Sequence, residues 1–107
     1  MEQKRAAFYE AIAEAIRECN EFGYHPTKWQ AMNSELGPIE AAKKLVLSGD
    51  FQDGFKRLLK EGRENLTVEA IVSRSEFAEL FSRDILTTAQ WRLVEGKRRL
   101  AEGRKGW

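Results

Sequence analysis

The sequence has few of the residues from which catalytic and metal sites are most often built. Cys19 is its only cysteine and His25 its only histidine. A lone cysteine cannot form an internal disulfide or, by itself, a thiolate zinc site, and no histidine cluster is available to replace it. The sequence therefore predicts no catalytic residues, no metal and no cofactor. We expect a protein that is not an enzyme.

Long apolar runs are also missing. No stretch approaches the roughly 18 apolar residues that a membrane span requires, and residues 1–5 are not followed by the apolar segment of a signal peptide. From these absences we expect a cytoplasmic protein with no membrane partner. The 107 residues, 42% apolar and 33% charged, suit one globular domain with a single modest core.

What is present is helical periodicity, divided into short segments by glycine and proline. Phe8, Ile12, Ile16 and Cys19 recur at the spacing of one helix face, which predicts a first helix over residues 3–21. Prolines at helix starts and glycines at helix ends predict three further helices. We place them at residues 26–36, 38–48 and 51–61, the last capped by Asp50 or Asp53.

Serine and threonine mark the remaining helix starts. Thr67 is the best N-cap candidate in the chain, Ser75 is expected to cap a turn or two, and Ser82 to cap a long last helix. The β-branched residues at 67–72 also fit a short strand, but a lone strand has no partner here, so we favour helix. The prediction is an all-α, compact, single-domain bundle of six to seven short helices over residues 1–101, with a frayed tail at 102–107.

From residue 22 to about residue 93 the chain follows a recognisable pattern. Its parts are FGYHPTKW at 22–29, GF at 54–55 with Leu58, GR at 62–63 and LTVE at 66–69. This pattern resembles a widespread family of small bacterial all-helical proteins that lack an assigned activity. The stretch at 54–69 is its most specific part. The resemblance implies an association with DNA-processing and defence gene neighbourhoods, and it brings no catalytic residues.

Two clusters are candidates for structural or partner-binding roles. Tyr24, His25 and Trp29 combine residue types that often anchor a protein partner or stack on nucleic-acid bases, although such residues more often cover a helix end and complete the core. Arg63 and Glu69 are expected to form an ion pair between two short helices. The alternative for Arg63 is a phosphate or carboxylate contact.

A third cluster is basic. Residues 1–81 carry 11 Lys and Arg against 14 Asp and Glu, a net of −3, whereas residues 82–107 carry 7 against 3, a net of +4. The cations that could follow a phosphate backbone on the last helix are Arg92, Lys97, Arg98, Arg99 and Arg104. The alternative is a solvated face that complements the negative end of the helix dipole.

These observations rank two functions. The first is a non-enzymatic protein-interaction module, an accessory to a larger bacterial system, with a protein partner of unknown identity. The second is a nucleic-acid-binding protein that contacts DNA or RNA through the basic last helix. The near-zero whole-chain charge, +1, favours the first.

Overall fold

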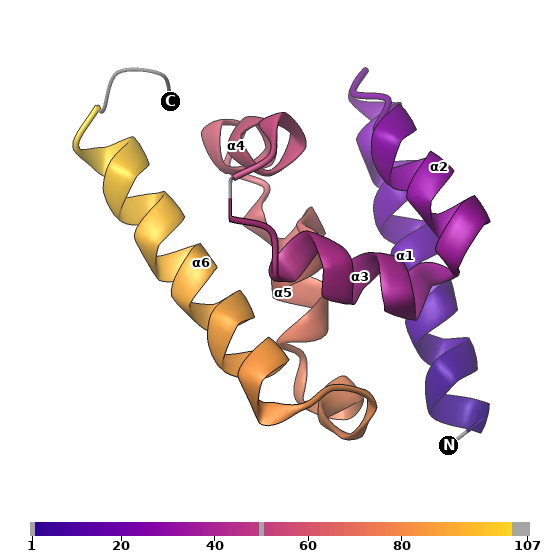
Figure 1. Cartoon of the computed structure of the whole chain (residues 1–107). Helices are drawn as coiled ribbons and strands as arrows, with labels where there is room; N and C mark the ends of the chain where they lie inside the picture. The colour runs from indigo at the N-terminus through magenta and orange to yellow at the C-terminus, as the bar shows by residue number, and fades with distance from the viewer. Residues whose placement is uncertain (1, 50, 104–107) are drawn as a thin grey trace.

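The structure is a computed structural model that describes residues 2–49 and 51–103. Within these residues the chain forms six α-helices and two 3-10 helices (Figure 1). In chain order they are α1 (Glu2–Glu21), α2 (Thr27–Leu36), α3 (Pro38–Val46), α4 (Asp53–Lys60), η1 (Glu64–Leu66), α5 (Val68–Val72), η2 (Ser75–Leu80) and α6 (Arg83–Ala101). The predicted all-α class and compact single-domain bundle are confirmed, and residues 67–72 form a cap and a helix, not a strand.

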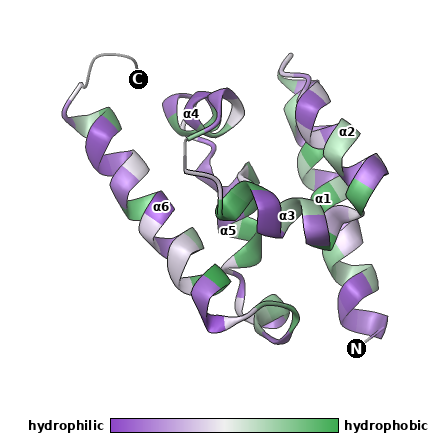
Figure 2. Cartoon of the chain, viewed as in Figure 1, coloured by the Kyte–Doolittle hydropathy of each residue, from purple (hydrophilic) through white to green (hydrophobic). Residues whose placement is uncertain are grey.

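The core lies where α3 and α5 fill the space between α1 on one side and α6 on the other (Figure 1). Phe8 of α1 is fully buried, and its ring packs edge-on against Phe77 at 5.2 Å and Phe81 at 5.3 Å between ring centroids. Such edge-on aromatic pairs add stabilisation beyond the area they bury. The short α5 is the most apolar element at the centre (Figure 2).

Side-chain caps at two of the predicted helix starts are confirmed. The hydroxyl of Thr67 accepts a hydrogen bond from the backbone N–H of Ala70 at 3.1 Å, and Ser82 accepts one from Ile85 at 3.3 Å. The prediction for Ser75 is wrong. That serine is the first residue of η2 and follows Arg74, which makes no side-chain cap bond.

The start of α4 also differs from the prediction. The helix begins at Asp53, so residue 53 is helical and does not act as the cap, while Gln52 takes the cap position without a side-chain hydrogen bond. Asp50, the other predicted cap, lies outside the described residues. Phe51 was expected inside the helix, but it remains in the preceding loop because its ring packs against α6, as described below.

The last helix ends at Ala101, and Gly103 follows it with a φ of +67°, a conformation that suits glycine after a helix end. The rest of the predicted tail, 104–107, lies outside the described residues. Within the described part of the chain, no helix has the length and apolar content needed to cross a membrane.

Candidate partner-binding cleft

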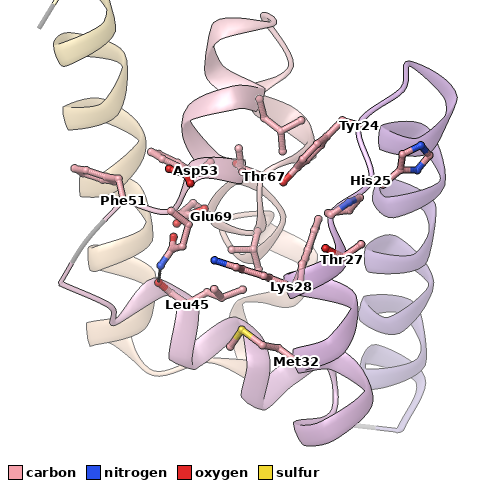
Figure 3. Close-up of a pocket in the computed structure, with 17 residues that line it drawn as sticks. Tyr24, His25, Thr27, Lys28, Met32, Leu45, Phe51, Asp53, Thr67 and Glu69 are labelled. Atoms are coloured by element: carbon pink, nitrogen blue, oxygen red, sulfur yellow. Dashed lines mark hydrogen bonds between the residues drawn. The ribbon is translucent and has the colours of Figure 1, made fainter. Parts of the chain in front are cut away.

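A cleft of about 500 Å³ opens between two walls of the bundle. One wall consists of the α1–α2 loop and α2, and the other of α4 with the loop before it (Figure 3). The floor is the start of α5 at residues 67–69. Most of the lining is apolar or aromatic, and the volume of the cleft falls in the range typical of binding pockets. All three residues predicted to contact a partner, Tyr24, His25 and Trp29, line this cleft.

Tyr24 forms the part of the first wall that reaches α4. Gly23 turns the chain at the end of α1 with a φ of +90°, and the Tyr24 backbone N–H donates to the Cys19 carbonyl at 2.9 Å. The Tyr24 hydroxyl lies close to the position that a Cβ on Gly54 would take, so any larger residue at 54 would have to displace the Tyr24 side chain. The Arg57 guanidinium lies 5.1 Å from the centroid of the Tyr24 ring. Burial raises the pKa of the Tyr24 phenol.

His25 and Trp29 take different positions on the same wall. The exposed His25 ring turns back toward α1, where its Nδ1–H donates to Oδ1 of Asn20 (Figure 3). This contact holds His25 in the turn between α1 and α2. Trp29 is half-buried and packs against the core, and its buried indole N–H has no acceptor among the described residues. Its position is compatible with both a core role and a cleft wall.

A buried ion pair holds the floor of the cleft to α6. Glu69 is 1% exposed and Arg92 is 3% exposed. Arg92 Nε donates to Oε2 of Glu69 at 2.8 Å. The other two nitrogens of the guanidinium donate to the Ser48 carbonyl and to Oε1 of Gln52, each at 2.9 Å. Buried charges of this kind need such partners, because each loses its hydration on folding.

The same guanidinium positions the second wall. It lies 4.7 Å from the Phe51 ring centroid and 5.6 Å from that of Phe55, and these two rings stack at 5.3 Å. Gln52, whose amide oxygen accepts from Arg92, uses its amide nitrogen to donate to the Leu45 carbonyl at 3.4 Å (dashed in Figure 3). Arg92 therefore fixes the loop that carries Phe51 and Gln52 into the cleft.

The environment of Glu69 shifts its proton affinity. Burial raises the pKa of the Glu69 carboxyl above its ordinary value, and the hydrogen bond and positive charge of Arg92 lower it in part. The net direction is upward because desolvation of a carboxylate with only 1% exposure outweighs the Arg92 donor and the hydrogen bond from the backbone N–H of Glu69 itself.

The predicted ion pair between Arg63 and Glu69 is wrong. Glu69 instead pairs with Arg92, and the Arg63 guanidinium lies 4.1 Å from the centroid of the Phe22 ring. The turn at Gly62, with a φ of +72°, directs the chain so that Arg63 covers the α1–α2 turn. Glu69 follows the Thr67 cap into the core, where an uncharged partner would leave its carboxylate uncompensated.

The basic cluster of the last helix is divided between interior and surface. Arg92 is buried, so its assignment as a nucleic-acid contact is wrong. The three other members that the structure describes are each ion-paired at the surface: Lys97 with Glu64 at 3.1 Å, Arg98 with Glu95 and Glu102 at 2.6 Å each, and Arg99 with Glu95 at 2.7 Å. Hydrogen bonds from Arg98 and Arg99 lower the pKa of Glu95 to about 2. Arg104 lies outside the described residues.

Sequence reasoning missed the role of Arg92, although a signal was present. The four buried residues of α6 are Ile85, Ala89, Arg92 and Gly96. They recur at i, i+4, i+7 and i+11, the spacing of one helix face. Arg92 therefore occupies an inward position by helical geometry alone. A search for charged residues within apolar periodicity would have selected it.

Among the described residues, no group of three or more His, Cys, Asp or Glu could hold a metal ion. No family model, curated protein or solved structure matches the chain.

Proposed function

We propose that the protein is an interaction module that accepts apolar side chains of a protein partner in the cleft between α2 and α4. The observation that carries this proposal is the convergence of Tyr24, His25 and Trp29 on one mostly apolar cleft of about 500 Å³. Large apolar concavities with a few polar groups are the usual form of binding sites. Partner anchors at such sites are often aromatic or aliphatic side chains that fill a pocket.

The charges around the cleft favour an apolar occupant. Lys28 and Asp53 line it with opposite charges, and the floor carboxylate of Glu69 is paired with Arg92. These charges sum to about zero, so the cleft offers no net attraction to an anion such as a phosphate backbone. Its walls instead offer apolar surface, which a partner would remove from water on binding.

The nucleic-acid alternative has less support. Arg92, one of its predicted contacts, is buried, and each surface cation of α6 at residues 97–99 has a carboxylate partner. A gel-retardation assay at low salt with DNA and RNA tests this alternative directly. Strong retardation that weakens steeply with salt, and is lost when residues 97–99 become alanine, would favour it over the cleft.

A displayed library of random 16-residue peptides tests the proposal even while the natural partner is unidentified. Wild-type protein serves as bait, and Met32→Glu serves as the cleft-blocked bait, because Met32 lines the cleft and is half-buried outside the core cluster. We expect enriched peptides that carry apolar anchors and bind wild type at least about tenfold more tightly than the blocked bait, the effect of losing about 1.4 kcal/mol.

Val94→Glu is the matched control, since Val94 is 67% exposed on α6, away from the cleft. Peptides should bind this variant as they bind wild type. Peptides that lose affinity for Val94→Glu but keep it for Met32→Glu would move the interaction surface to α6. A library that yields no peptide above background would contradict the proposal.

A further inference from the structure

Trp29 brings an unpaired donor to the cleft. Its indole N–H is buried and has no acceptor among the residues that the structure describes. The buried polar groups of the floor do have partners: the Thr67 hydroxyl donates to a backbone carbonyl, and the Glu69 carboxylate accepts from Arg92. Because a buried N–H without an acceptor is costly, Trp29 is the cleft residue with the most to gain from a ligand that brings one.

Access to this donor requires only a local change. Trp29 lines the cleft and is half-buried, while its nitrogen is covered in the described conformation. The χ2 torsion of a tryptophan has a broad energy profile, so the ring can turn about it. The other α2 residues that line this wall, Lys28 and Met32, have long flexible side chains and lie outside the core cluster. A ligand seated beside Trp29 can therefore draw the N–H edge toward itself.

The acceptor should be a neutral carbonyl oxygen. Lys28 and Asp53 line the cleft with opposite charges, so an anion would find no net attraction to offset its loss of hydration. A hydroxyl brings a proton that needs an acceptor of its own. An amide carbonyl brings an acceptor alone. In a polypeptide it also lies directly beside a side chain, which can supply the apolar group that fills the cleft.

The carbonyl must also be free of bonds within the partner. In an α-helix every carbonyl except those of the last turn accepts from the N–H four residues further on. In an extended segment the carbonyls carry no such local bond, and successive side chains point to opposite sides. An extended segment therefore offers a free carbonyl and an apolar side chain together, whereas the middle of a helix offers only the side chain.

We propose that the cleft binds an extended segment of the partner, in which one main-chain carbonyl accepts a hydrogen bond from the Trp29 indole N–H while the adjacent apolar side chain fills the cleft. This inference rests on the proposed function and specifies how the partner is held. Folding has already removed the N–H from bulk water, so the bond requires no further desolvation of the donor. It adds affinity and fixes the position of the segment along the cleft.

The indole N–H resonance of Trp29 reports the bond directly. NMR spectra of the full chain would be recorded as a peptide enriched on the wild-type bait is added, with the resonance assigned from Trp29→Phe. We expect it to move downfield, as hydrogen-bonded protons do, while the indole resonance of Trp91, 56% exposed on α6, stays unchanged. A Trp29 resonance that stays in place while the methyl groups of Met32 and Leu45 shift would overturn the bond and leave the cleft intact. A library that yields no peptide would instead count against the proposed function, so the two failures are distinguishable.

Backbone replacements in the same peptide locate the carbonyl. An alkene in place of an amide removes its carbonyl and its N–H, whereas N-methylation of that amide removes only the N–H. We expect one amide at which the alkene weakens binding about three- to tenfold and N-methylation does not, as the loss of one neutral hydrogen bond implies. A peptide with no such position, or one that is helical around its anchor when bound, would overturn the extended segment.

Replacement of Trp29 by benzothienylalanine, introduced by codon suppression, is the matched change on the protein side. Sulfur takes the place of the ring N–H, so the bicyclic body stays and the donor is lost. A melting curve checks that the variant folds before binding is measured. The amide and alkene peptides should then bind it within about twofold of each other, because their difference depends on the donor. An undiminished difference in the folded variant would assign the donor to another residue.

Asn33 is the internal competitor for the indole N–H. It lies four residues further along α2, and its buried Oδ1 also lacks a partner among the described residues. We expect Asn33→Ala to leave the Trp29 indole resonance of the free protein in place and the affinity for the peptide unchanged. A shift as large as the one caused by the peptide would show that the two side chains already pair in the free protein, and the inference would then be wrong.

Discussion

The inward and outward faces of α6 use the same residue type in opposite ways. Arg92 faces inward at 3% exposure, with Glu69, Ser48 and Gln52 as its partners. Arg98, less than two turns further along, faces solvent and bonds to glutamates of its own turn and the next. The contrast teaches that a cluster of arginines in a sequence has no single meaning. Burial decides whether a cation organises a wall or complements a surface.

Among substitutions on the two faces of α6, Arg92→Met is expected to have the largest effect on stability. The substitution leaves Glu69 buried without its cation and releases the loop at Ser48 and Gln52, so we expect the free energy of unfolding to fall by about 3 to 5 kcal/mol. Urea denaturation followed by circular dichroism measures it. The double variant Arg92→Met/Glu69→Met should recover part of the loss. A loss below about 1 kcal/mol for the single variant would contradict the role of the pair.

The next prediction concerns the pH dependence of stability, which the buried partner of Arg92 on the inward face controls. The folded-state pKa of Glu69 is raised by burial, so its contribution to stability is fully present below the unfolded pKa and is lost as pH rises through the folded pKa. The stability of wild type relative to Glu69→Gln should therefore fall as pH rises above about 4, the ordinary range of a glutamate pKa. Denaturation midpoints over a pH series provide the measurement. A relative stability that rises with pH would show that Arg92 outweighs burial.

Gly96→Ala tests how closely the inward face packs. A Cβ at Gly96 would lie 2.8 Å from atoms of both Leu59 and Phe55. Alanine gains about 1 kcal/mol of helix propensity over glycine, but overpacking costs about 1 to 3 kcal/mol. We expect a net loss near 1 kcal/mol, measured by thermal unfolding. A gain in stability would mean that α4 and α6 move apart easily.

The smallest effect on stability is expected on the outward face of α6. Arg98→Ala removes exposed ion pairs with Glu95 and Glu102, and such pairs contribute only about 0.2 to 1 kcal/mol each. Stability should therefore change by less than about 1 kcal/mol, and peptide binding at the cleft should not change. A loss as large as that of Arg92→Met would remove the distinction between the two faces.

The helices were largely predictable because local signals and burial agree. Phe8 and Ile12 share an apolar stripe with the spacing of a helix, and the caps at Thr67 and Ser82 act within their own turns. Such features depend on neighbours in sequence. The same reasoning failed at Phe51, because the ring leaves the α4 pattern to stack on Phe55 and meet Arg92 from a distant helix.

The candidate site was predictable only in part. Tyr24, His25 and Trp29 are close in sequence, so their common wall followed from composition and turn signals. The opposite wall depends on a contact between Arg92 and Glu69, which are 23 residues apart. No local rule selects the partner of Glu69 from the arginines of the chain. Tertiary packing makes that choice.

The most direct test of the cleft as a docking site is a methyl NMR titration with a peptide enriched on wild-type protein. We expect the methyl resonances of Met32, Leu45 and Val68, which line the cleft, to shift while those of Val94 on the outer face of α6 stay unchanged. Shifts at Val94 without shifts at Met32 and Leu45 would contradict the account.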